Sequence, residues 1–448
     1  MTFKSALEID CGIRYMYDSL CINSSCGHKK LLESKMMTTT SEINSYYCRL
    51  NDIHHKDCSK IAHALMSLKD IHNTLSRLNG GTTLDDIELF EIKHLAMLST
   101  QVRNMIVEQH ITAIELPTLD EVVDILDPDG NNIDSFYIYD SYNEELREVR
   151  KMMQALQAQA EELSDDKRQE LTRVTQRHAD LELEVRERLS QQLITHGTHL
   201  QQALDNMAQL DIFIAKSEQI QKMSLCFPNI TDNTYTLYNN MFNPAVKWHL
   251  AEQGRDFMPI DISFGNTPVT IIGANMGGKS VVLKTLALNQ LLAQYGFGVA
   301  AVSCTITPVE EVALCIGDEQ SIVKGVSSFA SEILAIDAVI KKIKSGISTL
   351  ALIDEPARTT NPVEGTALVE GLLDVIKQSS GGFILTTHYN IENKNVKRYR
   401  VKGLRNGQMD YTLEETHSGD VPHEAIAIAE NLGIDPQWIA YTKKNINN

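Results

Sequence analysis

The chain has 448 residues and a formal net charge of −18, with 43% hydrophobic and 22% charged residues. These proportions are ordinary for a globular protein, and this length suggests two or three domains. No run of about 20 apolar residues occurs, and the N-terminus has acidic residues where a signal peptide would have an apolar segment, so we expect no membrane association and a cytoplasmic location.

Eight cysteines are too few in a chain of this length for a disulfide framework. Five of them precede residue 60, where His28, His54 and His55 also lie, and they are Cys11, Cys21, Cys26, Cys48 and Cys58. A zinc site is one interpretation of this cluster. The lack of a Cys-x-x-Cys pair favours the other interpretation, ordinary reduced thiols.

The N-terminal half has the periodicity of helices. Apolar residues at three- and four-residue steps predict one amphipathic helix over residues 56–78, ended by Asn79-Gly80-Gly81, and a second helix follows over residues 84–108. Asp127-Pro-Asp-Gly130 predicts a turn. Residues 141–220 contain no proline and one glycine, and a heptad-like apolar spacing there predicts long helices that form a hairpin or an arm.

The pattern changes after Phe227-Pro228. Short apolar runs suited to strands occur at 269–272, 350–353 and 382–385, and helical stretches separate them. Strands that alternate with helices indicate an α/β sheet. We therefore expect a helical domain over residues 1–227 and an α/β domain over residues 228–448.

Residues 273–280, Gly-Ala-Asn-Met-Gly-Gly-Lys-Ser, match the P-loop pattern G-x-x-x-x-G-K-[ST] in full. The motif follows an apolar strand and precedes a helical run over 281–293, which is the context that this pattern requires. Its backbone N–H groups and the helix N-terminus suit phosphate oxygens. Lys279 is expected to reach the β- and γ-phosphates of ATP, and Ser280 to bind Mg²⁺.

Two further apolar runs end in polar residues. Asp354 and Glu355 follow the run 350–353, and we expect Asp354 in the Mg²⁺ shell and Glu355 as the base that orients or activates the attacking water. His388 follows Leu385-Thr-Thr, where it is suited to contact the γ-phosphate or its water. Capping of the next helix by the two acids, and a purely structural histidine, are the alternatives.

These three elements, in this order, resemble the ATPase domain of the MutS family, a branch of the ABC-type ATPases. Residues 274–280 resemble the family's Asn-Met-Gly-Gly-Lys-Ser core, residues 318–329 with Glu332 its signature segment, residues 257–262 the segment before the P-loop strand, and residues 419–429 its C-terminal dimerisation region. The N-terminal half resembles the family's helical core and lever more weakly. The resemblance implies an α/β P-loop NTPase domain of the ABC type, preceded by an all-α core and lever domain.

The resemblance also implies a dimer in which Ser327 of one subunit meets the γ-phosphate held by the other, and the partner is an identical chain or a MutS-like paralogue. With the P-loop, it assigns a set of nucleotide-binding residues: Gly273, Ala274, Asn275, Met276, Gly277, Gly278, Lys279, Ser280, Val281 and Ser327. ATP and Mg²⁺, the latter held by Ser280 and Asp354, are the implied ligands, and Glu355 and His388 the catalytic residues.

The sequence leaves open which of two classes of molecule the ATPase acts on, DNA or a protein; we call this molecule the client. Family resemblance favours an ATP-driven switch acting on mismatched or branched DNA. However, the chain lacks the Phe-x-Glu motif of mismatch readers, it is acidic, and Pro356 and Pro362 flank the loop after Glu355. That loop is similar to the loop of truncated members that reactivate adenosylcobalamin-dependent amino acid aminomutases, so an ATP-dependent remodeller of a protein partner is the alternative. A regulatory subunit that binds nucleotide and turns over slowly is a third interpretation.

Overall fold

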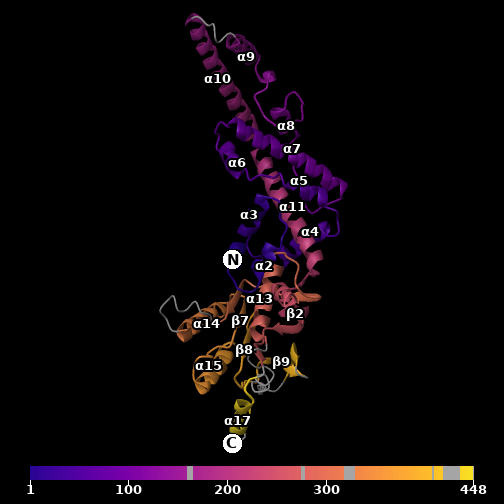
Figure 1. The fold of residues 1–448 in the computed structure, drawn as a ribbon, viewed down its shortest axis with the longest axis vertical. Helices are drawn as coiled ribbons and strands as arrows, with labels where there is room; N and C mark the ends of the chain where they lie inside the picture. The colour runs from indigo at the N-terminus through magenta and orange to yellow at the C-terminus, as the bar shows by residue number, and fades with distance from the viewer. Residues whose placement is uncertain (159–164, 274–277, 317–327, 406–407, 417–433, 447–448) are drawn as a thin grey trace. The chain divides into compact units, whose positions relative to one another are not determined.

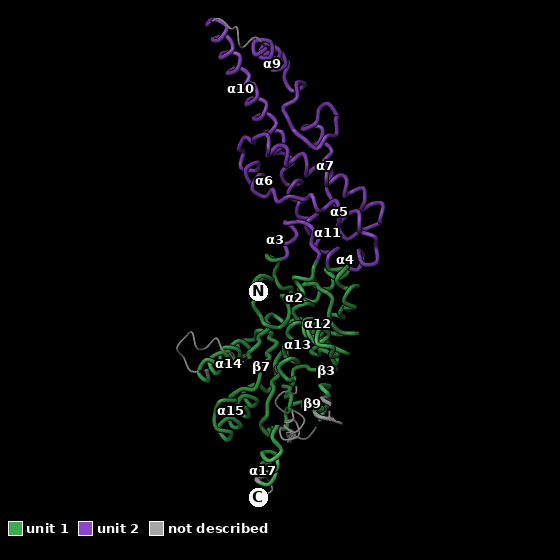
Figure 2. The backbone as a smooth tube through the Cα atoms, viewed as in Figure 1, with its two compact units in different colours: residues 1–20, 32–48, 216–448 green, residues 21–31, 49–215 purple. Residues whose placement is uncertain are grey.

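The computed structural model describes residues 1–158, 165–273, 278–316, 328–405, 408–416 and 434–446. The chain forms two compact units, coloured separately in Figure 2. Unit 1 comprises residues 1–20, 32–48 and 216–448, and unit 2 comprises residues 21–31 and 49–215. The domain boundary at residue 228 remains a prediction, since the compact units combine segments that are distant in the sequence.

Unit 2 is helical in its described part (Figure 1), as the periodicity of the N-terminal half predicts. Its elements are the larger part of α3 (Ser25–Glu33), the end of α4 (Thr40–Ile53), α5 (Ser59–Leu65), α6 (His72–Asn79), α7 (Asp86–Glu108), α8 (Asp120–Leu126), η1 (Asp140–Tyr142), α9 (Glu144–Gln157), α10 (Asp165–Ile194) and most of α11 (Gly197–Met223). Asp85 begins α7 with a capping box, because its side chain accepts from the Glu88 N–H while the Glu88 side chain accepts from the Asp85 N–H.

The single helix expected over residues 56–78 is two helices, α5 and α6. The backbone N–H groups of Met66, Ser67 and Leu68 each donate to the carbonyl three residues earlier, so the turn tightens and α5 ends. The Asp70 carboxylate then accepts from the His72 N–H at the start of α6. The apolar spacing was still informative, since Leu68 is buried within the break. Periodicity marks the buried face but does not report this local change of hydrogen bonding.

The long helices expected over residues 141–220 form as α9, α10 and α11. Arg177 of α10 pairs with Glu145 of α9, at 2.8 Å between Nε and Oε1. Gly197, the one glycine in this stretch, begins α11 where a Cβ atom would lie 2.0 Å from the side-chain oxygen of Asn79. A larger residue at this position would therefore collide with the end of α6.

Unit 1 contains a mixed α/β arrangement. A six-stranded sheet has the order β10–β9–β4–β8–β7–β6, in which β10 is antiparallel and the other neighbours are parallel. Its strands are β4 (Val269–Ile272), β6 (Glu311–Cys315), β7 (Thr349–Ile353), β8 (Phe383–Thr387), β9 (Lys397–Arg405) and β10 (Gln408–Glu415). A four-stranded sheet has the order β1–β5–β2–β3, from β1 (Asn229–Ile230), β2 (Tyr235–Met241), β3 (Ile260–Gly265) and β5 (Ser303–Ile306).

Helices cover both faces of the larger sheet (Figure 1). On one face, α14 (Ser328–Lys344) and α15 (Pro362–Val375) form a core with side chains of β7 and β8 such as Ile353 and Leu385. Alternate residues of a strand point to opposite faces, and α13 (Lys279–Gln294) packs against β6, β7 and β8 from the other side. This helix is almost entirely buried, and polar residues such as Thr285 and Asn289 are buried along with its apolar ones.

The N-terminal segments of unit 1 cover the end of α13. They include α1 (Phe3–Ala6) and α2 (Ile13–Asp18). The Tyr47 hydroxyl donates to the Ala293 carbonyl at 3.1 Å, and the Gln294 side-chain amide donates to the Met37 carbonyl at 2.7 Å. The Tyr295 hydroxyl donates to the Met1 carbonyl at 3.0 Å. The first residues of the chain therefore help to fix the helix that follows the P-loop.

Unit 1 is completed by α12 (Pro244–Glu252) and α17 (Pro436–Ile446). Across the described parts of the chain, no helix is both long enough and apolar enough to cross a membrane.

Candidate active site

The P-loop pattern lies between β4 and α13, as expected from its flanking sequence. Strand β4 ends at Ile272, and α13 begins at Lys279 with Gly278 as its N-cap. Gly278 has φ 76°, in the left-handed region that favours glycine, and a Cβ atom there would lie 3.1 Å from the Tyr411 ring. The predicted binding residues Ala274, Asn275, Met276 and Gly277 lie outside the described residues.

The Lys279 side chain lies between two oxygen atoms. Its ammonium donates to the Gly273 carbonyl at 2.7 Å and lies 3.0 Å from Oε1 of Glu355. Both charged side chains are largely buried, with 4% of Lys279 and 11% of Glu355 exposed. Arg358 lies 3.8 Å from the other Glu355 oxygen. Two of the predicted site residues are therefore an ion pair, in which each balances the charge of the other.

Ser280 and Asp354, the two expected Mg²⁺ ligands, lie in contact. The Ser280 hydroxyl donates to Oδ2 of Asp354 at 2.5 Å, and the Thr386 hydroxyl donates to Oδ1 at 2.6 Å. Thr386 also accepts from the Glu355 N–H at 2.9 Å. This arrangement follows from the strand order, because β8 lies between β4 and β7 and so its end is adjacent to the ends of both.

The loop after β7 has an unusual backbone. Glu355 and Ala357 have φ values of 44° and 62°, which cost non-glycine residues conformational energy. Two contacts hold the loop: the Ala357 N–H donates to Oε1 of Glu332 at 3.2 Å, and the Tyr389 hydroxyl donates to the Ala357 carbonyl at 2.8 Å. Burial raises the pKa of Glu332 despite the Ala357 hydrogen bond and nearby Arg358. The backbone that carries Glu355 is thus constrained on its C-terminal side.

His388 has fewer contacts with this group. His388 directly follows β8, its ring packs on Tyr389 with centroids 4.2 Å apart, and its buried Nδ1 has no hydrogen-bond partner among the described residues. Ser327 lies outside the described residues. The described structure therefore brings together Gly273, Lys279, Ser280, Asp354 and Glu355, with His388 at the end of the neighbouring strand.

A largely apolar cavity of about 250 Å³ opens beside the start of α13. Gly278, Val281 and Val282 line it from the P-loop side, and Tyr411 lines it from β10. Residues 255–258 contribute Arg255, Asp256, Phe257 and Met258. Aromatic and aliphatic walls beside a P-loop pattern are suited to the nucleoside part of a nucleotide.

The sequence motifs did not predict Thr386 and Tyr411 as residues of the site. Thr386 was visible as a polar residue near the end of an apolar run, but its role depends on which strands are neighbours. Tyr411 has no local signal, because β10 reaches the P-loop only through the pairing of β9 with β4.

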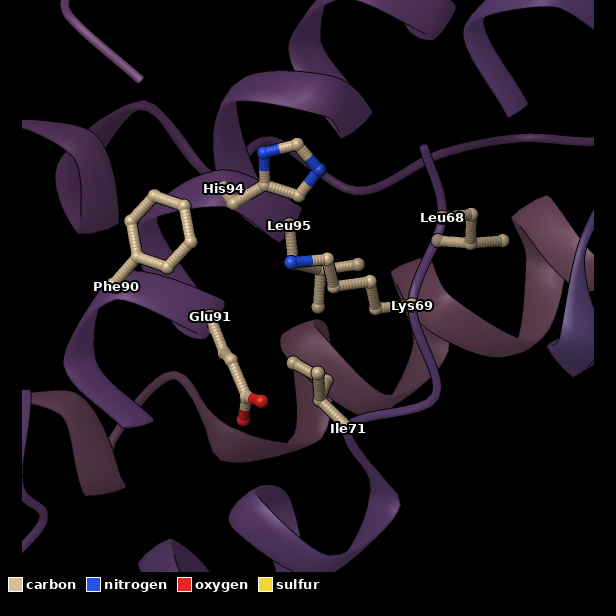
Figure 3. A pocket seen from close by; sticks show the side chains of 7 residues that line it. All are labelled: Leu68, Lys69, Ile71, Phe90, Glu91, His94 and Leu95. Carbon is tan, nitrogen blue, oxygen red and sulfur yellow. The ribbon is translucent and has the colours of Figure 1, made fainter. Parts of the chain in front are cut away.

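Unit 2 contains a small hollow (Figure 3), lined by residues of α7 and of the segment just before α6. Its volume of about 10 Å³ has room for roughly one water molecule. The Lys69 ammonium lies 5.6 Å from the centre of the Phe90 ring, and Nδ1 of His94 is hydrogen-bonded to Oδ1 of Asp134. The hollow is therefore part of the packing of unit 2. Where the structure describes the chain, no three His, Cys, Asp or Glu side chains gather into a metal-binding group.

Comparisons with known proteins agree with the family resemblance of the sequence motifs. Residues 269–427 match the family model described as MutS domain V. The chain is similar to a protein named Endonuclease MutS2 from Caldanaerobacter subterraneus subsp. tengcongensis, with 31% identity over 231 residues, which is 50% of this chain and 28% of the relative. Endonuclease MutS2 from Streptococcus pneumoniae (strain Hungary19A-6) is 26% identical over 458 residues, which is 93% of this chain and 54% of the relative.

The second alignment extends the similarity over nearly the whole chain, including the helical N-terminal half. The chain spans about half the length of that relative, and less of the first. The resemblance inferred from the P-loop, the Asp354-Glu355 pair and the signature segment is thus confirmed at the level of the family.

Proposed function

Because this chain is related to the MutS family, we propose that it binds and hydrolyses ATP and uses the reaction to switch between two conformations. The observation that carries this proposal is the convergence of Lys279, Ser280, Asp354 and Glu355 at the carboxyl ends of the parallel strands β4 and β7, which flank β8. Their domain would then be a P-loop NTPase domain of the ABC type.

The side chains fit ATP and Mg²⁺. A hydroxyl and a carboxylate in contact, Ser280 and Asp354, are the oxygen donors that Mg²⁺ prefers, and Thr386 holds the carboxylate in place. Lys279 supplies a buried positive charge for phosphate oxygens, and the cavity lined by Val281 and Tyr411 receives the nucleoside. Bound Mg²⁺ would neutralise charge on the phosphates.

Glu355 is the proposed base. Its backbone is held by the constrained loop and by the hydrogen bond from its own N–H to Thr386, and its carboxylate contacts Lys279. Its pairing with Lys279 has a consequence for the cycle: phosphate oxygens compete with Glu355 for the Lys279 ammonium. When the phosphates take that place, the Glu355 carboxylate is free to accept a proton from the attacking water.

We propose a dimer in which two ATPase sites face each other. The Ser327 segment of one subunit would complete the site formed by Lys279 and Asp354 of the other. ATP then favours the closed arrangement and hydrolysis releases it, so that the client receives the energy as a difference in affinity between two states. The second subunit is an identical chain or a paralogue.

The family relationship favours DNA as the client, with mismatched or branched duplexes as the substrate class. The second candidate is a protein client, such as an adenosylcobalamin-dependent aminomutase, and one observation favours it. The net charge is −18, whereas neutralisation of DNA phosphates requires clustered Lys and Arg side chains.

The experiment that tests the proposal is steady-state ATP hydrolysis by the purified protein, alone and with matched, mismatched and branched duplexes over a series of salt concentrations. Hydrolysis that depends on Mg²⁺ supports the ATPase. Stimulation by DNA that weakens steeply with salt supports the DNA client, because phosphate contacts release counterions. ATP hydrolysis that no duplex alters favours the protein client. No hydrolysis under any condition contradicts the proposal.

A further inference from the structure

Two cysteines distant in the sequence lie in contact in unit 1. The Sγ atoms of Cys226 and Cys304 are 3.7 Å apart, although 78 positions separate the two residues. All eight cysteines of the chain are free thiols. Closing this pair to a disulfide would bring the sulfurs to about 2.0 Å, a movement of less than 2 Å that side-chain rotation can supply.

Backbone hydrogen bonds hold both cysteines of the pair. Cys304 lies in β5, where it pairs with Tyr238 of β2. Cys226 lies in the short connection between α11 and β1, joined to Val299 by two backbone hydrogen bonds of 2.9 Å. Because both backbones are held by hydrogen bonds, rotation of the two side chains must bring the sulfurs together.

The two thiols differ in access and in acidity. Cys226 is partly exposed, whereas Cys304 is 6% exposed and lies near the buried rings of Tyr47 and Tyr238. A hydrogen bond from the Cys304 thiol, together with bonds from backbone groups, lowers the pKa of Cys226 even though burial acts to raise it. The same hydrogen bond, with burial, raises the pKa of Cys304. The lowered pKa suits Cys226 to attack, and Cys304 is placed to resolve because its sulfur lies 3.7 Å away.

We propose that Cys226 and Cys304 are a modification site, at which a small disulfide such as oxidised glutathione converts the dithiol to an internal disulfide. The Cys226 thiolate attacks one glutathione sulfur, the S–S bond of glutathione breaks, and one glutathione leaves as a thiolate. The Cys304 sulfur then attacks Cys226, a second glutathione leaves, and the two thiol protons pass to the two glutathiones. The protein loses two electrons and oxidised glutathione gains them.

The cysteine pair lies outside the candidate nucleotide site, but the loop that a disulfide would close contains the P-loop part of that site. Asp354, Glu355 and His388 lie beyond this loop in the chain. The closed loop runs from residue 226 to residue 304 and contains β4, the P-loop motif and α13. The disulfide would tie the end of α11 to the four-stranded sheet.

The test is to incubate the full chain with oxidised glutathione, alkylate the remaining thiols and identify cysteine-containing peptides by mass spectrometry. We expect a peptide pair joined through Cys226 and Cys304, and its loss after reduction with dithiothreitol. In Cys304→Ser, which removes the resolving thiol, we expect glutathione to remain on Cys226. In the double variant of the exposed cysteines, C21S with C48S, the joined peptides should persist.

Two results would overturn the proposal. The first is wild-type protein in which Cys226 and Cys304 are both alkylated, or in which glutathione stays on Cys226. The second is loss of the joined peptides in the C21S and C48S double variant, which would assign the exchange to the exposed thiols. The wild-type measurement decides the matter even if a cysteine variant folds poorly.

Discussion

The ammonium of Lys279 lies 3.0 Å from a carboxylate oxygen of Glu355, and both side chains are largely buried. The two residues have separate proposed roles, one in holding phosphate and one in accepting a proton. Their ion pair makes these roles interdependent, because each side chain neutralises the other until a ligand separates them.

Replacing Glu355 by Gln should separate binding from hydrolysis. Glutamine retains the shape but cannot accept the proton, so we expect hydrolysis to fall by about 10²- to 10⁴-fold. Binding of a fluorescent ATP analogue should be kept or strengthened, because Lys279 loses its charged competitor. The matched control is Glu364→Gln, an exposed acid in the first turn of α15. Wild-type turnover in Glu355→Gln would show that Glu355 is not the base.

Thr386→Val should weaken catalysis through Asp354. The hydroxyl of Thr386 donates to Asp354 and accepts from the Glu355 N–H, and valine keeps its shape without these bonds. We expect turnover to fall about tenfold, which is the effect of about 1.4 kcal/mol, and the Mg²⁺ concentration for half-maximal activity to rise. Thr386→Ser should restore both. Thr366→Val, whose hydroxyl bonds the carbonyl of Pro362 in its own helix, is the control. An unchanged Mg²⁺ requirement would remove Thr386 from the site.

Tyr411→Ala should reduce affinity for the nucleoside only. Tyr411 lines the cavity beside Gly278, so loss of its ring should weaken ATP binding about tenfold, as aromatic contacts contribute roughly 1 kcal/mol beyond area burial. Binding of inorganic triphosphate, measured by calorimetry, should not change. Tyr441→Ala, an exposed tyrosine of α17, serves as the control. If the variant loses triphosphate and ATP binding equally, the cavity is not the nucleoside site.

Mixing two inactive variants should restore activity if the site is shared between subunits. Lys279→Ala removes phosphate binding in its own subunit, and Ser327→Ala removes the segment donated to the other. A mixed dimer has one intact composite site, so we expect hydrolysis to recover in the mixture but in neither variant alone. The measurement is ATP hydrolysis after the variants exchange subunits. Full activity of Ser327→Ala by itself, or no recovery in a mixture with demonstrated subunit exchange, would contradict the shared site.

Asp70 should make part of the stability of unit 2 depend on pH. Burial acts to raise the pKa of Asp70, but hydrogen bonds from His72 and Lys29 outweigh it and lower the pKa from 3.8 to about 2. Because the pKa of Asp70 is lower in the folded chain than its ordinary value of 3.8, the ionised carboxylate stabilises the folded state above about pH 3.8. This stabilisation is lost as the pH falls towards 2. In acid unfolding followed by circular dichroism, Asp70→Asn should be less stable than wild type above pH 4, and the difference should vanish near pH 2. Asp124→Asn, an exposed acid of α8, should show no such convergence.

Local sequence was sufficient for much of the fold and for part of the site. Strands β4, β7 and β8 form where the apolar runs predict, and α13 starts directly after the P-loop motif. These features are local because a run of apolar residues and a glycine-rich turn constrain only their own backbone. The long helices after residue 141 form for the same reason, since their residues have high helix propensity. The break between α5 and α6 was missed because its hydrogen bonds leave the apolar period unchanged.

The sequence by itself determined the match to the P-loop pattern, the acidic pair after β7 and the resemblance to the MutS family. The tertiary structure alone decided that Thr386 holds Asp354, that Tyr411 lines the cavity beside Gly278, that Cys226 meets Cys304 and that the first residues of the chain pack on α13. For Thr386 and Tyr411 the physical reason is the order of the strands. Side chains meet where strands are neighbours in the sheet, and that order is set by burial of the whole core and not by any local pattern.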